Sequence, residues 1–249
     1  MTPGAYSAIS YATHHFCNPL SPETLDRTLA FARLTPGDTA LDLGCGNGLV
    51  SLHLAERYGL SVDAVDIAPE MIALARERVG ERGAPGAVRL RVASAAEAVE
   101  TTTPVRLVVA TGAWGLVEGR PEPERILRRL AAAVEPGGYV LWGDPFLKAP
   151  PPERLAAVLS AVDYRSHAAY IEIDEAAGMR CLAAEVSPDA DFDDYIFRMH
   201  DAVRAWLDAH PDYPQAAQRR MYNAMMRDLH LEEGRATLGF GLYLFRVGT

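Results

Sequence analysis

The segment from Ala40 to Gly48 constrains this chain more than any other. A short apolar run, Thr39–Leu43, enters a glycine-rich turn, and a helical pattern follows from Asn47. Glycines let a backbone adopt left-handed conformations and approach a ligand closely. The start of the following helix offers unpaired N–H groups and the positive end of its dipole. We therefore expect an anionic or nucleotide-like ligand at this turn.

Two classes of ligand fit such a turn. A dinucleotide site needs the spacing G-x-G-x-x-G, whereas Gly48 comes one residue early and Leu49 follows it. Asp66 ends the next apolar run, where a carboxylate can accept hydrogen bonds from ribose hydroxyls. Both classes use this acidic residue, so Asp66 by itself does not separate them.

Strand and helix patterns alternate through the first 150 residues, which predicts an α/β fold with a parallel sheet covered on both faces. The expected strands are 39–43, 61–66, 88–92, 105–110 and 139–142, and the expected helices are 24–33, 47–58, 69–82 and 123–134.

The regular alternation of strand and helix patterns ends after the triple proline at 150–152. We expect a helix at 153–162, the last strands at 181–186 and 237–247, and helices at 192–209 and 216–229 inserted between those strands. This divides one domain into an N-terminal cap segment (1–35), a ligand-binding core (36–150) and a remainder with a helical cap (151–249).

Charge and cysteine usage narrow the classes of partner. The net charge is −9, from 24 basic and 33 acidic residues, which argues against a nucleic-acid partner. The three cysteines suggest no disulfide framework, and no residue spacing predicts a metal site. The absence of a signal-like or membrane-spanning apolar run predicts a cytoplasmic protein. The sequence leaves both a monomer and a homodimer open as the oligomeric state.

Four segments together resemble the class I S-adenosylmethionine-dependent methyltransferases: LDLGCGNG (41–48), VDAVDIAPEMIALAR (62–76), VRLVVATGAW (105–114) and VEPGGYVLWGDPF (134–146). The resemblance implies a Rossmann-like fold with a mostly parallel seven-stranded sheet and a helical cap. It also implies S-adenosylmethionine as cofactor and S-adenosylhomocysteine as product.

The resemblance implies roles for individual residues. The glycine segment would contact the methionine and ribose parts of the cofactor, and Asp66 would bind the ribose. Ile67 and Met71 would pack near the adenine, and Ser94 stands where the family often has an acidic residue. The full set expected at the cofactor is Asp42, Gly44, Cys45, Gly46, Asn47, Gly48, Asp66, Ile67, Met71, Ser94, Ala95 and Thr111.

The chain also resembles a bacterial subgroup of small-molecule methyltransferases without an assigned substrate. The matching segments are 14–21, Gly112-Ala113-Trp114, GDPFL (143–147), 192–214 and 238–245, which together extend over nearly the whole chain.

Candidates on the acceptor side are weaker, because each has an ordinary structural alternative. His14 and His15 are proton acceptors or loop histidines, Asp144 is a substrate ligand, a base or a turn residue, and Tyr195 reaches the site from a helix. Tyr11, Trp114 and Phe146 are expected to line the acceptor pocket.

Methyl transfer to nitrogen, oxygen or carbon of a small molecule, in secondary metabolism, follows as the main hypothesis. Two alternatives remain at this point: a protein that binds S-adenosylmethionine without methylating, and a nicotinamide-dependent oxidoreductase.

Overall fold

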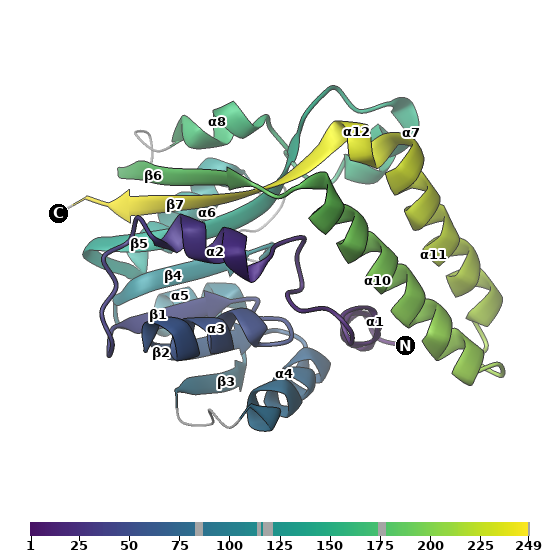
Figure 1. Cartoon of the computed structure of the whole chain (residues 1–249), viewed down its shortest axis with the longest axis horizontal. Coiled ribbons are helices and arrows are strands. Elements are labelled where there is room, and N and C mark those ends of the chain that lie inside the picture. The colour runs from purple at the N-terminus through teal and green to yellow at the C-terminus, as the bar shows by residue number, and fades with distance from the viewer. Residues whose placement is uncertain (83–86, 114–115, 117–121, 174–177, 249) are drawn as a thin grey trace.

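A seven-stranded sheet forms the centre of the computed structural model, which describes residues 1–82, 87–113, 116, 122–173 and 178–248 (Figure 1). The strand order is β3-β2-β1-β4-β5-β7-β6. Strands β1 to β5 pair in parallel, and β7 is antiparallel to both of its neighbours. The strands are β1 (Thr39–Leu43), β2 (Ser61–Asp66), β3 (Val88–Val92), β4 (Val105–Thr111), β5 (Val134–Leu147), β6 (Met179–Val186) and β7 (Leu238–Val247).

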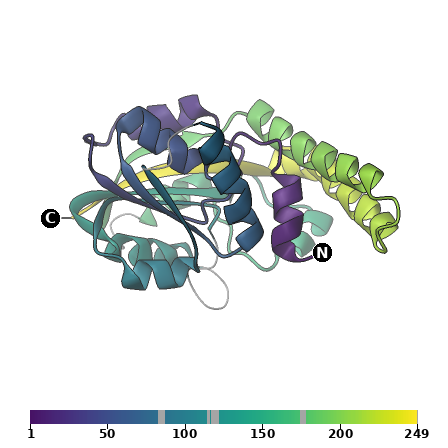
Figure 2. The same cartoon turned by 90° about the horizontal axis from the view of Figure 1, so that it is seen from below.

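Helices cover both faces of the sheet (Figure 2). One face packs against α2 (Pro22–Leu29), α3 (Leu49–Tyr58) and α4 (Pro69–Glu81). The other packs against α5 (Ala95–Thr101), α6 (Pro123–Ala132) and α8 (His167–Ile171). The apolar strands are buried on both sides for this reason, which confirms the predicted α/β class.

Two long helices form an arm beside the sheet (Figure 1). Helix α10 (Asp189–Ala209) leaves the end of β6, and α11 (Ala216–Leu229) returns antiparallel to it. A π-helical turn, η1 (His230–Gly234), and the short α12 (Arg235–Thr237) lead into β7. The helices at 192–209 and 216–229 therefore lie between the last two strands in the chain, as predicted. Helix α7 (Glu153–Leu159) follows β5.

The structure corrects several predicted boundaries. The strand predicted at 139–142 extends over Val134–Leu147, because it pairs with β4 on one side and with β7 along most of its length on the other. Pro136-Gly137-Gly138 lies inside this strand, with Gly137 at φ +78°, and does not form a separate turn. The helix predicted at 24–33 ends at Leu29.

Among the described elements, η1 and α12 were not predicted, and neither were three short helices: α1 (Pro3–Ser10), α5 and α8. Each has only five to eight residues, too few for a helical period to stand out in the sequence. Their starts do carry capping signals, since Thr2, Ser94 and Ser166 each accept a hydrogen bond from the third residue on. Among the described residues, no helix is both long and apolar enough to cross a bilayer.

Candidate functional site

The predicted glycine turn connects β1 to α3 at the carboxyl end of the sheet. Gly44, Gly46 and Gly48 all have left-handed backbones, with φ of +69°, +57° and +76°. Gly48 also caps α3, and a Cβ there would lie 2.9 Å from the Cβ of Ala75 on α4. A side chain at this position would therefore force α3 and α4 apart, which explains the early third glycine.

Asp66 ends β2 beside this turn. One of its carboxylate oxygens accepts the N–H of Gly46 at 3.1 Å, and the other accepts the N–H of Ala68 at 2.9 Å. Partial burial raises the pKa of Asp66, while these backbone donors act in the opposite direction. Two oxygens offer about four acceptor positions, so the carboxylate retains positions for ribose hydroxyls. Together with the left-handed glycines, these acceptors fit S-adenosylmethionine.

The side chains of Asp42 and Cys45 are buried at the glycine turn. Asp42 is buried and accepts a 2.5 Å hydrogen bond from the Ser51 hydroxyl on α3. Burial raises the pKa of Asp42 to about 6. Cys45 is also buried, and its backbone N–H donates to Val65 at 2.9 Å. The bond from Ser51 supports a structural role for the Asp42 side chain, and burial supports one for that of Cys45; ligand contact at either stays a prediction.

A segment that we call the strap, residues 11–20, lies across the turn. The Asn47 amide donates to the carbonyls of His14 and His15, each at 3.1 Å. Further along, the Asn18 amide donates to the hydroxyl of Thr111 at 3.1 Å and to its carbonyl at 3.2 Å, at the end of β4. The Cys17 thiol accepts the backbone N–H of Asn47 at 3.3 Å. The strap is therefore fastened to the carboxyl ends of β1 and β4, where open α/β sheets bind ligands.

Three rings gather between the strap and α10. The hydroxyls of Tyr11 and Tyr195 are 3.0 Å apart, and His14 packs edge-on against both rings at 5.3 Å. The Nε2 atom of His14 lies 2.9 Å from the backbone carbonyl of Tyr195. Because a carbonyl can only accept, Nε2 carries the proton, and Nδ1 of the neutral ring is an acceptor.

His14 is 3% exposed, and its Nδ1 has no hydrogen-bond partner among the described residues. Burial lowers the pKa of His14, although the bond to Tyr195 opposes this shift. Burial likewise raises the pKa of Tyr11 and of Tyr195, which keeps both phenols neutral. The structure thus brings together three of the predicted acceptor-side residues.

The residues expected near the adenine follow β2 and β3 in the chain. Ile67 is 72% exposed, whereas Met71 is buried and its Cε would lie 3.7 Å from a Cβ at Gly46. The Ser94 hydroxyl accepts the Glu97 N–H and caps α5, which Ala95 begins. Ser94 thus has a local structural role besides its predicted one.

The remaining acceptor-side candidates are dispersed. Asp144 and Phe146 are buried in β5 on the face that packs against α8, near Tyr164, Tyr170 and Tyr243. Burial and the nearby Asp144 carboxylate raise the pKa of these tyrosines. His15 is exposed and lines a cavity of about 360 Å³ that His14 and Tyr195 also line, together with Arg82 and Arg198. Trp114 lies outside the described residues.

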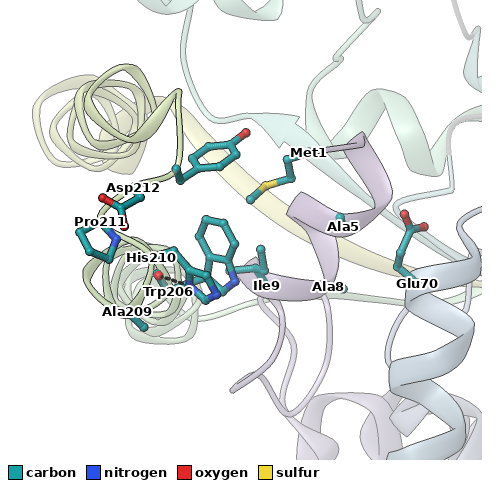
Figure 3. Close-up of a pocket in the computed structure, with 11 residues that line it drawn as sticks. Met1, Ala5, Ala8, Ile9, Glu70, Trp206, Ala209, His210, Pro211 and Asp212 are labelled. Atoms are coloured by element: carbon teal, nitrogen blue, oxygen red, sulfur yellow. Dashed lines mark hydrogen bonds between the residues drawn. The ribbon is translucent and has the colours of Figure 1, made fainter.

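A second, apolar groove of about 720 Å³ separates α1 from the end of α10 (Figure 3). Ala5, Ala8 and Ile9 line one wall, and Trp206 and Tyr213 line the other. Tyr11, His14 and Tyr195 are not among the described residues that line this groove. In the described part of the chain, no group of three or more His, Cys, Asp or Glu side chains could hold a metal ion.

Asn18 and Cys17 are site residues that the sequence analysis did not single out. Asn18 lies in the strap segment that resembles the bacterial subgroup, so its position was marked but its contact was not. An amide that bonds a strand 93 residues away has no local signature in the sequence.

Comparison with known proteins shows what the chain is similar to. Residues 40–138 match the family model described as a methyltransferase domain. The chain carries a methyltransferase domain. Together with the seven-stranded fold and the G-x-G-x-G turn, this makes it an S-adenosylmethionine-dependent methyltransferase, with S-adenosylmethionine as cofactor. These findings lend no support to the alternative of a nicotinamide-dependent oxidoreductase.

The relatives match different shares of this chain. The uncharacterized protein YjhP of Escherichia coli is 26% identical over 94% of this chain and 95% of its own length. A ubiquinone biosynthesis O-methyltransferase of Xanthomonas euvesicatoria is 36% identical, but the match spans only 50% of this chain and 48% of that protein. An S-adenosylmethionine-dependent methyltransferase from Geobacter sulfurreducens, solved with S-adenosylhomocysteine, has the same fold, with a TM-score of 0.86, 24% identity and 97% of both chains covered.

Proposed function

We propose that this methyltransferase modifies nitrogen, oxygen or carbon of a small acceptor enclosed by the strap and α10, and that His14 accepts the acceptor's proton. One observation carries the proposal. The Nδ1 atom of His14 is buried, lacks a partner among the described residues and belongs to a ring already held in one tautomer by the Tyr195 carbonyl. A buried acceptor left unpaired costs about 1–3 kcal/mol, which a bound substrate would recover.

The remaining residues bind and align the reactants. S-adenosylmethionine, when bound, supplies an already activated methyl group. The glycine turn and Asp66 would hold its amino-acid and ribose parts, with Ile67, Met71, Ser94 and Ala95 around the adenine. The strap closes the site from water through Asn47 and Asn18. Alignment of this kind contributes about 7–11 kcal/mol in favourable cases.

Burial suits His14 to the role of base. It disfavours the charged imidazolium and so lowers the pKa, which keeps the ring neutral and able to accept a proton at neutral pH. Residues Tyr11 and Tyr195 would line the acceptor beside it. Phe146, Trp114, Asp144 and His15 remain candidates for further contacts with the acceptor.

Transfer of a labelled methyl group tests the proposal. The purified protein is incubated with methyl-labelled S-adenosylmethionine and small-molecule extract, and the labelled product is isolated. For an acceptor that loses a proton, His14→Ala should lower the rate by about 10²–10⁴-fold while calorimetric binding of S-adenosylhomocysteine is retained. His210→Ala, an exposed histidine on the arm, is the matched control. An unchanged rate for His14→Ala would remove His14 from the mechanism, and label found only in macromolecules would refute a small acceptor.

The cellular setting is part of the same proposal. We propose that the enzyme acts in the cytoplasm, in secondary metabolism, and without a membrane partner. A nucleic-acid partner is disfavoured because the acidic chain repels phosphate groups. Cell fractionation tests the location. Sedimentation of the purified protein distinguishes a monomer from a homodimer.

A further inference from the structure

The side chain of Asn47 faces the strap. It is 2% exposed, and its amide nitrogen donates to the carbonyls of His14 and His15 at 3.1 Å each. Its amide oxygen accepts the Leu49 N–H at 3.2 Å, in the first turn of α3. Both amide N–H groups are therefore used within the protein, and neither remains for a ligand.

The position of Asn47 gives these bonds a second consequence. It lies between Gly46 and Gly48, whose left-handed backbones shape the cofactor turn. Its backbone N–H also donates to the Cys17 thiol of the strap. The turn that would hold the cofactor is thus bonded directly to the backbone that carries His14.

We infer that Asn47 is a positioning residue for His14: its amide fixes the strap so that the imidazole stays in its buried place between Tyr11 and Tyr195. The functional meaning rests on the proposed role of His14. The positioning itself can be tested separately.

Two fixed points hold the histidine. The Asn47 amide restrains its backbone, and the Tyr195 carbonyl restrains its ring. Without the Asn47 amide, the strap would still be held further along, by Cys17 and Asn18, but its backbone at His14 would lose this restraint and the ring could turn toward solvent. An amide with two donors suits the first point, because it can bond the adjacent carbonyls of His14 and His15 at the same time.

The electrostatic surroundings define a measurable signal. His14 faces Tyr11 from the end of α1, and Tyr195, Asp194 and Arg198 from α10. The cavity that His14 lines also contains Arg78 and Arg82 from the end of α4, Asp191 from α10 and His15. Burial is the main cause of its lowered pKa; Arg198 adds to this shift, and Asp194 opposes it. A strap released from Asn47 would expose the ring to water, and the pKa of His14 would rise toward 6.5.

Histidine titration by NMR on the full-length protein tests the inference without any acceptor. In Asn47→Ala we expect the pKa of His14 to rise by about half a unit or more. We also expect amide hydrogen exchange across residues 11–20 to quicken by about tenfold. Calorimetry with S-adenosylhomocysteine shows whether the variant retains a folded cofactor turn.

Asn223→Ala is the matched control. Asn223 is another buried asparagine, and its amide donates to the His200 carbonyl at 2.9 Å, within the arm. This variant should leave the pKa of His14 and strap exchange unchanged. Equal effects from both variants would mean general loosening and would overturn the inference, as would an unchanged His14 in Asn47→Ala.

Asn18→Ala provides a second route if Asn47→Ala does not fold. It releases the other end of the strap, from Thr111, and should shift His14 in the same direction but less; no shift would count against a strap that holds the ring. The outcome is separable from that of the proposed function. A shifted pKa in Asn47→Ala with normal methyl transfer in His14→Ala keeps the positioning role and refutes the catalytic one.

Discussion

The hydroxyls of Tyr11 and Tyr195 lie 3.0 Å apart and join the N-terminal segment to the N-terminal third of the longest described helix. The residues are 184 positions apart in the chain. Both rings are largely shielded from water, and His14 packs against the two of them. This pair therefore bridges the strap and the arm next to the proposed base.

Removing either hydroxyl should loosen that bridge. Tyr11→Phe and Tyr195→Phe should each lower the free energy of unfolding by about 1 kcal/mol, since each leaves one buried hydroxyl unpaired. In a double-mutant cycle measured by urea denaturation, the two changes should couple by about 1 kcal/mol. Tyr213→Phe, which removes an exposed bond to Gln215, should have an effect below about 0.5 kcal/mol. Strict additivity of the first two variants would contradict a direct bond.

Asp66 should dominate cofactor affinity. Asp66→Ala removes the carboxylate proposed to accept both ribose hydroxyls and also frees the Gly46 N–H. Charge-assisted bonds contribute about 1.5–3 kcal/mol each, so calorimetry should show at least about 10²-fold weaker binding of S-adenosylhomocysteine. Asp63→Ala, on the same strand but paired with Arg91, is the control and should bind normally. Tight binding by Asp66→Ala would relocate the ribose site.

The buried carboxyl of Asp42 should make stability depend on pH. Its pKa is about 6 in the folded protein and about 3.8 when unfolded, so the folded state holds its proton more tightly. Folded stability therefore falls as pH rises from about 4 to about 6.

The variant Asp42→Asn has no carboxyl group to ionise, so it avoids this loss of stability. Its amide oxygen can still accept the hydrogen bond from the Ser51 hydroxyl. Relative to the wild type, the variant should gain up to about 3 kcal/mol between pH 4 and pH 7, measured by urea denaturation. Glu56→Gln, on the exposed side of α3, should show little such trend. A flat difference for Asp42→Asn would show that Asp42 ionises in the fold without cost.

Gly46 should be intolerant of a side chain for two separate reasons. Its φ is +57°, and a Cβ would lie 2.8 Å from the Cys17 thiol. Gly46→Ala should thus cost about 1–2 kcal/mol of backbone strain and about 1–3 kcal/mol of crowding. Gly37→Ala has a φ of +95° and open space, so it should show strain alone. Thermal denaturation should find the crowding part relieved by Cys17→Ala; no relief would mean that the strap moves aside freely.

Local patterns predicted the framework of the fold. The strands predicted at 39–43, 61–66 and 88–92 are β1, β2 and β3 with the predicted bounds. Such predictions succeed because a short segment with apolar residues at alternate or successive positions is a local pattern, which a sequence displays directly. The early Gly48 was equally informative, since its left-handed backbone and its contact with Ala75 exclude a side chain.

Side-chain partners were less predictable. Asn47 was expected to bind the cofactor because it lies in the turn, yet its amide holds the carbonyls of His14 and His15. Which group an amide bonds depends on what the fold brings within about 3 Å, and the neighbouring letters do not encode this.

The sequence by itself determined the α/β architecture, the cofactor turn and the acidic residue after β2, because each depends on residues close together in the chain. Only the tertiary structure decided that His14, Tyr11 and Tyr195 form one buried cluster. The strap and α10 meet there through contacts between residues nearly two hundred positions apart, which only the folding of the whole chain brings together. The same folding leaves the Nδ1 atom of His14 buried and without a partner among the described residues, and the proposed chemistry follows from that atom.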